Sequence, residues 1–500
     1  MLKPIIDAQY EDFHINQYVS FKKIFKQNDF ELFNQLSGDA NPLHFNAEYA
    51  SHTAFNTPIV PMHLATLPLS AIAGMIFPGH RSLYLNTNIQ ALEPIYYDDE
   101  ITYSAKLISK SDMTSILKVR TILFKNKLIL LKADQTIKVR NDVIPNQFFS
   151  VTKDQTMTPT SIVNYAFITG ASGEIGKNIA LSLAQCGFHL ILHYHKNEKS
   201  VEECKKRCLE YGVNVLIAQA DLTDHSSVEK LGCLVKDKGV THFVHAASSK
   251  LDSHFNALMN SNYVTLKIIT ECLLPNMLKM QFGKIILIGS SAIQSNPKDW
   301  DDYVAAKTAA LSYMNAINKH FKDVGLHAFV FSPGLVATEF SKNIRKHNDR
   351  SLLPEQVAKR VVDIIASHDE THDYYCYEPH GERYGSFGFQ SATLSKPVIS
   401  GNEKVDIIEI SSPSDSIETK LNQFIRKFFK LNHDYPLEGS RFEEYQHWTS
   451  LKHLEFLLEV EKLFNVTLSS SVIDKTHVYD DLLQVLRYVS SQKYLKEAVL

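Results

Sequence analysis

Tyr303 and Lys307 are the two side chains whose types and spacing best suit proton transfer. They lie four residues apart in YVAAK, and a helix would put both on one face. A free tyrosine has a pKa of about 10, so it needs a nearby cation to donate a proton near neutrality. Ketone reduction requires such a proton on oxygen and a hydride on carbon. The pair alone is also common on ordinary helix surfaces, so it needs supporting motifs.

A glycine-rich turn supplies the first support. The segment TGASGEIG, residues 169–176, follows the strand pattern NYAFITG and opens a helix pattern. Backbone N–H groups at a helix N-terminus bind a pyrophosphate in this context. Glu174 stands where the middle glycine is usual, so its carboxylate must point to solvent, and Gly173 supplies room beside it.

The hydropathy pattern predicts three segments. Residues 1–145 read as one long helix and a meander of strands, an α+β pattern. Residues 160–392 alternate apolar strands with helices, which predicts a doubly wound parallel sheet of Rossmann type covered on both faces. Residues 412–495 are nearly all helical in pattern and predict a small helical bundle. Linkers are expected at 146–162 and 391–415.

The middle segment resembles the short-chain dehydrogenases/reductases, and among them the 3-oxoacyl-(acyl carrier protein) reductases. The resemblance rests on the glycine turn, on HAAS at 245–248 and on Ser290 preceding YVAAK. It implies that Ser290, Tyr303, Lys307 and Asn262 are catalytic: Ser290 binds the substrate oxygen, and Asn262 holds a water of the proton relay. It also implies cofactor contacts at Thr169, Gly170, Ser172, Gly173, Ile175, Gly176, Lys196, Asp221, Leu222, Ala246, Ala247, Tyr303, Lys307, Pro333, Gly334 and Thr338.

The second strand of this segment bears on which nicotinamide cofactor is used. An acid at its tip would select NAD through the ribose 2′-hydroxyl. The strand ends HLILHYHKNEK, with no acid at the tip and Lys196 just beyond. We therefore expect NADP(H) in preference to NAD(H).

The first segment contains GDANPLHFNAEYA, which is followed by an apolar helix pattern. It resembles the MaoC-like, (R)-specific enoyl-thioester hydratases of hot-dog fold. The resemblance implies a catalytic dyad of Asp39 and His44 that grips one water on a loop fixed by Pro42. The family usually has a glycine after histidine at the start of the helix, for the oxyanion hole, and this chain has Met62 there. A hydratase domain that has altered specificity or is inactive therefore stays open as an alternative.

The last segment resembles an acyl carrier protein. Ser450 matches the serine that accepts phosphopantetheine, at the start of a long helix, where the helix dipole suits a phosphate. Thr449 replaces the acid usual before that serine, and acids and bases are nearly balanced here. The alternative is a helical docking or dimerisation module in which Ser450 is a plain N-cap.

Net charge, apolar runs and cysteine spacing limit the classes of partner and compartment that we expect. The net charge is −3, which gives no electrostatic case for nucleic acid. The sequence has neither an apolar run long enough to span a bilayer nor a signal-peptide pattern at its start, so we expect a cytoplasmic protein. The six cysteines form no CxxC pair, which favours free thiols and no metal site.

Together the three resemblances predict a multifunctional enzyme that reduces 3-oxoacyl thioesters and interconverts hydroxyacyl and enoyl thioesters. The acyl group, carried on the chain's own phosphopantetheine or on CoA, would visit both sites. Such an enzyme needs a phosphopantetheinyl transferase and an acyl-loading or acyltransferase partner, and we expect a homo-oligomer, dimer or higher. Two alternatives stay open: a reductase whose other segments are binding or assembly modules, and a reductase of a free alcohol or sugar-like substrate.

Overall fold

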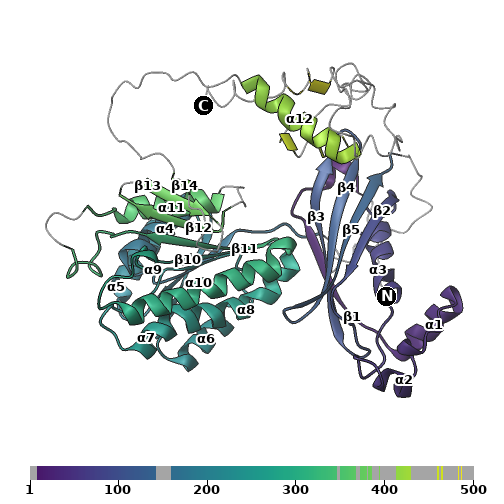
Figure 1. Ribbon diagram of the computed structural model, residues 1–500, viewed down its shortest axis with the longest axis horizontal. Coiled ribbons are helices and arrows are strands. Elements are labelled where there is room, and N and C mark those ends of the chain that lie inside the picture. Colours follow the sequence, from purple (N-terminus) through teal and green to yellow (C-terminus); the bar gives the residue numbers. More distant parts are fainter. Residues whose placement is uncertain are drawn as a thin grey trace.

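The computed structural model describes residues 8–141, 159–345, 350–366, 372–379, 381–385, 393–394 and 413–429, and a few single positions between 456 and 486. The described residues form two sheet-based halves (Figure 1). Among them, no helix has both the length and the apolar character required to cross a membrane.

The first half is a five-stranded antiparallel sheet in the order β1-β3-β4-β5-β2, which fits the hot-dog fold expected from the sequence. Its central helix α3 buries one apolar face, which includes Leu64, Leu69 and Ile72, in the core of this half. The hydroxyl of Tyr103, on β3, donates a hydrogen bond to the carbonyl of Ala65 at 2.7 Å and ties helix to sheet. The elements are η1 (Tyr10–Asp12), β1 (Tyr18–Ile24), α1 (Gln27–Ser37), η2 (Pro42–His44), α2 (Ala47–Ser51), α3 (Met62–Met75), β2 (Ser82–Ala91), β3 (Glu100–Ser111), β4 (Ile116–Lys125) and β5 (Leu128–Val139).

The second half is a nine-stranded sheet in the order β14-β13-β12-β11-β10-β9-β6-β7-β8, parallel from β12 to β8. The elements up to α8 are β6 (Tyr165–Thr169), α4 (Glu174–Gln185), β7 (His189–Tyr194), α5 (Glu198–Leu209), β8 (Val215–Gln219), α6 (His225–Val235), β9 (His242–His245), α7 (Phe255–Met259), η5 (Asn260–Val264) and α8 (Thr265–Met280). The remaining elements are β10 (Gly283–Ile288), α9 (Ala292–Ser295), α10 (Asp301–Phe321), η6 (Lys322–Val324), β11 (Leu326–Pro333), α11 (Pro354–Ala366), β12 (Tyr374–Glu378), β13 (Gly381–Gly385) and β14 (Thr393–Leu394).

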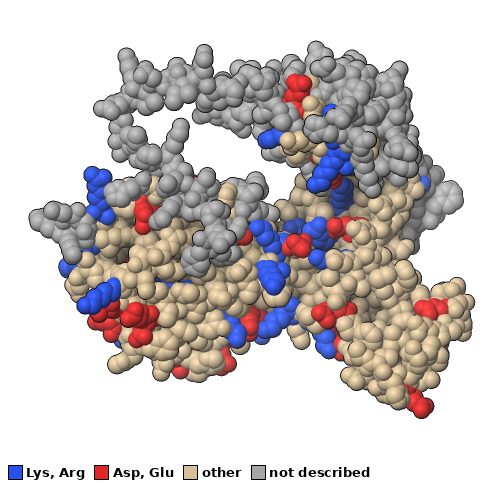
Figure 2. Space-filling model, viewed as in Figure 1, with Lys and Arg blue, Asp and Glu red and all other residues tan. Residues whose placement is uncertain are grey.

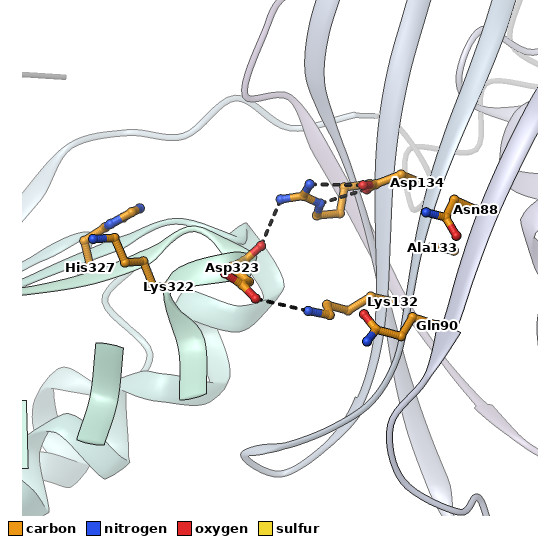
Figure 3. Close-up of a pocket in the computed structure, with 9 residues that line it drawn as sticks. Asn88, Gln90, Lys132, Ala133, Asp134, Lys322, Asp323 and His327 are labelled. Atoms are coloured by element: carbon orange, nitrogen blue, oxygen red, sulfur yellow. Dashed lines mark hydrogen bonds and ion pairs between the residues drawn. The ribbon is translucent and has the colours of Figure 1, made fainter. Parts of the chain in front are cut away.

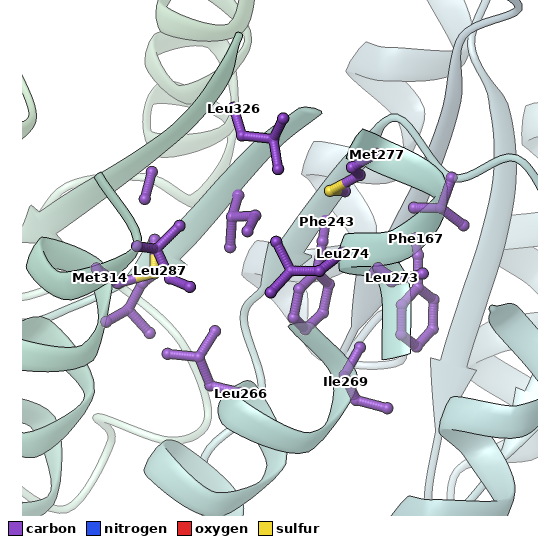
Figure 4. Close-up of a cluster of buried hydrophobic side chains, with 14 of the residues drawn as sticks. Phe167, Phe243, Leu266, Ile269, Leu273, Leu274, Met277, Leu287, Met314 and Leu326 are labelled. Atoms are coloured by element: carbon purple, nitrogen blue, oxygen red, sulfur yellow. The ribbon is translucent and has the colours of Figure 1, made fainter. Parts of the chain in front are cut away.

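Helices cover both faces of this parallel sheet. Side chains of α6, α8 and α10 pack with Phe167 and Phe243 on one face (Figure 4). Side chains of α4, α5 and α11 pack on the other face. Because β6 lies between β7 and β9, the strand order reverses beside it, and open α/β sheets bind ligands at the carboxyl end of such a reversal. The fold therefore predicts a ligand site at the turn after Thr169.

The two halves meet through buried polar contacts at the C-terminus of α8. The side-chain amide of Gln281 is 2% exposed and donates to the backbone carbonyls of Ser104 at 2.8 Å and Arg120 at 3.0 Å. Lys106 Nζ donates in turn to the carbonyl of Gln281 at 3.0 Å. The first half therefore docks on the edge where β10 begins, opposite to the edge that carries the glycine turn.

A polar groove runs along the same junction, lined from one side by β2, β4 and β5 and from the other by η6 and β11 (Figure 3). Arg120 binds Asp134 and also the carbonyl of Asp323, whose carboxylate lies 3.5 Å from Lys132 Nζ. Figure 2 shows blue and red side chains gathered there, in contrast to the charge-poor lobe at α1 and α2. The charges of the groove bind one another across the junction and reinforce the docking.

Parts of both expected linkers take part in regular structure. The expected linker at 391–415 overlaps β14 and the start of α12 (Pro413–Phe429). Proline is compatible with the first turn of a helix, so the Pro-Ser run that signalled a linker includes a helix start. Within the linker expected at 146–162, Thr160 pairs with Tyr18 of β1 through two backbone hydrogen bonds. Ser450 and Thr449 of the predicted carrier lie outside the described residues, as does most of the expected bundle.

Candidate functional site: a dinucleotide cleft and a separate Asp–His pair

The glycine turn lies between β6 and α4, and two of its glycines are dictated by close packing. Gly170 has a φ of +74°, and a Cβ there would lie 2.9 Å from the backbone of Ala247. A Cβ on Gly176 would lie 2.3 Å from the carbonyl oxygen of Gly170. Gly173, exposed at the N-cap of α4, has nothing nearer than 3.4 Å around its Cβ position. The turn therefore leaves space and N–H groups for a pyrophosphate at the helix N-terminus, and its residues fit a dinucleotide.

Glu174 stands at the position where a glycine is usual, and its side chain is exposed beside the turn. Its Oε2 accepts a hydrogen bond from the backbone N–H of Glu339 at 2.9 Å. Glu339 follows Thr338 in the segment after β11. The acid therefore ties that segment to the first turn of α4.

The adenine end of the cleft is formed after β7 and β8. Lys196 is exposed just beyond β7. Asp221 follows β8, and its Oδ1 accepts from the backbone N–H and hydroxyl of Thr223. Burial opposes ionisation of Asp221, but these hydrogen bonds and the nearby His195 and Lys196 hold its pKa below the usual value. Leu222 is buried beside it.

Tyr303 and Lys307 share a buried face of α10, as their spacing predicted. Burial raises the pKa of Tyr303 to about 12, and a hydrogen bond with Ser290 opposes that rise. Lys307 is 3% exposed; its Nζ donates to the carbonyl of Ile288 at 2.8 Å and lies 5.8 Å from the centre of the Tyr303 ring. Burial lowers the pKa of Lys307 to about 7. The three predicted groups thus meet at the carboxyl end of β10.

Asn262 lies in η5, a π-helical turn between α7 and α8. Its Nδ2 donates to the carbonyl of Leu258 at 2.9 Å and to Ser248 Oγ at 3.1 Å. Its Oδ1 is buried and accepts from no group among the described residues. Such single π-helical turns occur often at functional sites. The orphaned acceptor suits a water of the predicted relay.

The other predicted cofactor positions line the same edge of the sheet. Ala246 and Ala247 follow β9 and contact Gly170 through backbone atoms. After β11, the N–H of Gly334 donates to the carbonyl of Tyr377 at 2.7 Å, and Pro333 accepts from Ser291 at 3.0 Å. The predicted positions Thr169, Ser172, Ile175 and Thr338 also lie at this edge.

Two aromatic side chains that the sequence did not single out flank Tyr303. The ring of Trp300 packs edge-on at 6.0 Å, and the ring of Phe340 lies at 6.5 Å and is 45% exposed. Their closeness to Tyr303 and Thr338 in the sequence is the signal that could have found them. They give the mouth of the site an apolar wall.

Asp39 and His44 lie together in the first half: Asp39 is on the loop that leads into η2, and His44 is the last residue of η2. His44 Nε2 is 4.0 Å from Asp39 Oδ2, and His44 Nδ1 is 2.8 Å from the carbonyl of Ile59. Because that carbonyl can only accept, Nδ1 carries a hydrogen, and Nε2 is the ring nitrogen that faces Asp39. The pair is therefore spaced and oriented to hold one water.

Tyr97 is the further residue here that sequence reasoning missed. Its hydroxyl oxygen is buried and has no hydrogen-bond partner among the described residues. Burial, with the charges of Asp29 and Asp39, raises the pKa of Tyr97 to about 12. Met62 is the first residue of α3. The side chains of Met62, His63 and Ser70 are all exposed.

Comparisons with known proteins match both halves. Residues 164–349 match the family model described as short chain dehydrogenase, and residues 11–124 match that of the MaoC like domain. The 3-oxoacyl-[acyl-carrier-protein] reductase of Synechocystis is 24% identical over 200 residues, which are 38% of this chain and 81% of that protein. Dehydrogenase/reductase SDR family member 7 of Mus musculus is 31% identical over 193 residues, 35% of this chain and 56% of that protein. This chain thus spans little more than half the length of the mouse relative.

Among solved structures, a short-chain dehydrogenase from Sphingobium yanoikuyae in complex with NADPH is 20% identical, with a TM-score of 0.39 over 43% of this chain and 88% of that one. The two family matches coincide with the two halves of the fold. The chain thus carries a MaoC-like domain followed by a short-chain dehydrogenase domain.

Proposed function

We propose that the chain processes acyl thioesters at two sites. The reductase site uses NADP(H) to convert a 3-oxoacyl thioester into an (R)-3-hydroxyacyl thioester, and the first half interconverts that product with the enoyl thioester. The observation that carries the proposal is the buried Tyr303–Lys307 pair beside the glycine turn, in one chain with the Asp39–His44 pair. The relative named 3-oxoacyl-[acyl-carrier-protein] reductase supports this substrate class.

The cofactor is held by the glycine turn, by Asp221 and Lys196 at the adenine end and by Thr338 at the other end. Lys196 and the absence of an acid at the tip of β7 favour the 2′-phosphate of NADP(H). When bound, the nicotinamide supplies the hydride that reaches the carbonyl carbon. The protein supplies orientation and the proton.

The proton comes from Tyr303. Its hydroxyl gives a proton to the carbonyl oxygen, which also accepts a hydrogen bond from Ser290. Lys307, when charged, stabilises the phenolate that forms and so brings down a pKa that burial raises. A water on the orphaned Oδ1 of Asn262 relays the replacement proton. Trp300 and Phe340 contact the apolar acyl group beside the reacting carbonyl.

The Asp39–His44 pair performs the reversible hydration. One water between His44 Nε2 and Asp39 loses a proton to this pair as it adds to the β-carbon, and the pair returns a proton to the α-carbon. In this proposal the backbone N–H of Met62, at the start of α3, binds the thioester oxygen.

The distance between the sites makes transport part of the function. Ser290 precedes α9, whereas Asp39 lies beside α1 and α2, and these elements are at opposite ends of the molecule (Figure 1). The acyl group must be released or carried. We propose that a phosphopantetheine arm on Ser450 carries it, after modification by a phosphopantetheinyl transferase and loading by an acyltransferase partner.

The test is reduction of 3-oxoacyl-CoA followed through NADPH absorbance. Wild-type protein is expected to turn over, and Tyr303→Phe to lose nearly all activity. Absence of turnover with both CoA and carrier-linked substrates overturns the reductase proposal. Intact-mass measurement after co-expression with a phosphopantetheinyl transferase tests the arm. An unmodified Ser450 favours the alternative, in which the C-terminal segment is an assembly module.

A further inference from the structure

His193, near the end of β7, is a buried side chain that the reaction does not use. It is 2% exposed. Its Nδ1 lies 3.1 Å from the backbone N–H of Gly170, and its Nε2 lies 3.1 Å from the carbonyl of Ala220. An N–H can only donate and a carbonyl can only accept, so these neighbours fix the tautomer: Nδ1 is the acceptor and Nε2 carries the hydrogen.

The two groups bound by this ring belong to the two ends of the dinucleotide cleft. Gly170 is the glycine with positive φ in the turn that receives the pyrophosphate. Ala220 immediately precedes Asp221, the residue assigned to the adenine end. The backbone carbonyl of His193 also accepts from the N–H of Ala171 at 2.9 Å. One residue therefore joins the turn after β6 to the segment after β8, across β7.

The ring must be neutral to make these contacts. Burial lowers the pKa of His193 to about 4, against the favourable contact with the Ala220 carbonyl. A second proton would place an N–H against the N–H of Gly170. The acceptor at Nδ1 is therefore present throughout the neutral range.

We propose that His193 is a positioning residue for dinucleotide binding. It touches neither cofactor nor substrate. It holds the Gly170 N–H and the Ala220 carbonyl at a fixed separation, so that pyrophosphate and adenine are received without rearrangement. The inference rests on the dinucleotide cleft of the proposed function and does not depend on the identity of the ketone.

His189 provides a matched control on the same strand. Its Nδ1 accepts from the backbone N–H of Asn214 at 3.0 Å, the same kind of bond at the opposite end of β7. Loss of this bond perturbs the sheet away from the cofactor edge. A loss of NADPH affinity that came from general disturbance of β7 would appear in both variants, whereas positioning of the cofactor is specific to His193.

The experiment measures NADPH binding to the full chain by fluorescence titration. His193→Leu removes the acceptor, and NADPH affinity is expected to fall about tenfold, because the partly buried N–H of Gly170 loses its partner. His193→Asn keeps an oxygen at the position of Nδ1 and is expected to bind within about threefold of wild type. His189→Leu is expected to bind like wild type. In steady state, His193→Leu should raise KM for NADPH and leave kcat at saturating NADPH unchanged.

Equal losses in His193→Leu and His189→Leu would overturn the proposal, and so would unchanged affinity in His193→Leu. If the leucine variant does not fold, His193→Gln replaces it. Glutamine places its amide at the Nε2 position and must bind NADPH more weakly than the asparagine variant, or the proposal fails. Wild-type protein that binds NADPH without reducing a 3-oxoacyl thioester refutes the proposed function alone. Wild-type protein that binds neither NADPH nor NADH refutes this inference as well.

Discussion

The backbone N–H of Glu339 donates a hydrogen bond to Oε2 of Glu174 at 2.9 Å, which joins the segment after β11 to the first turn of α4. Both residues are exposed, and the carboxylate stands beside the turn that receives the phosphates of the cofactor. Glu174 therefore has two opposing effects. Its hydrogen bond holds the segment after β11 in place, and its negative charge repels the phosphates of the cofactor.

Glu174→Gln separates these two effects, because the amide keeps an acceptor and removes the charge. We expect NADPH to bind several-fold more tightly to this variant at low salt, and the gain to shrink as salt screens the repulsion. Titration with NADPH at two ionic strengths measures the change in affinity and its dependence on salt. Glu174→Gly, which also removes the tether, is the comparison. Equal NADPH affinity of Glu174→Gln and wild type at low salt would contradict the repulsion.

Lys307 should take up a proton when the cofactor binds. Burial lowers its pKa to about 7, so near pH 8 the side chain is mostly neutral in the free protein. The negative charge of a bound dinucleotide favours the cation and raises this pKa. Binding near pH 8 should therefore take up roughly one proton, and near pH 6 almost none. Calorimetric titration in buffers of different ionisation enthalpy counts the protons. If proton uptake were unchanged in Lys307→Met, another group would be the one that takes up the proton.

The two chemistries should be separable by mutation, because the sites are remote. Asp39→Asn is expected to lower hydration of an enoyl thioester by about 10²–10⁴-fold and to leave ketone reduction unchanged. Tyr303→Phe should do the reverse. Assays of hydration and ketone reduction on each variant test whether the two activities can be lost independently. A parallel loss of both activities in Asp39→Asn would show that the sites are coupled.

Tyr97→Phe tests the buried hydroxyl near Asp39. Because this hydroxyl has no partner among the described residues, its removal costs no hydrogen bond, and the melting temperature should be unchanged or higher. Hydration should fall about tenfold if the hydroxyl donates to the bound water or thioester. The pairing of full stability with reduced hydration is the expected signature. A stable variant with full hydration activity would leave Tyr97 outside the site.

Gln281 should contribute strongly to the stability of the whole chain. Gln281→Leu leaves the carbonyls of Ser104 and Arg120 buried without this donor, at a cost of about 2–4 kcal/mol in the free energy of unfolding. Denaturant unfolding measures this loss. Gln185→Leu removes an exposed glutamine that binds Tyr211, and it should change stability by less than about 0.5 kcal/mol. Similar losses of unfolding free energy in the two variants would argue against a stabilising role for the buried Gln281 contacts between the halves.

The local elements of the second half could be predicted from the sequence, for physical reasons. The glycine turn follows from strand, turn and helix patterns that are contiguous in the chain, and Tyr303 and Lys307 are one helical turn apart. The partners of His193 and Gln281 could not be predicted, because Gly170 and Ser104 are distant in sequence and only the folded sheet order brings them near. The same holds for the contact between the Glu174 carboxylate and the backbone N–H of Glu339, which are 165 residues apart in the sequence.

The apolar cluster under α8 has a consequence for how the chain could be divided. Ile122 and Phe124 of β4 belong to the same buried cluster as Ile269 and Leu273 of α8, and the Gln281 contacts lie next to it. The halves thus recognise each other through matched apolar and polar surfaces and not merely through the peptide that joins them. Two fragments expressed separately, one ending after Val139 and one beginning before Thr160, should find each other in solution and reconstitute the pair of domains, as a split protein does.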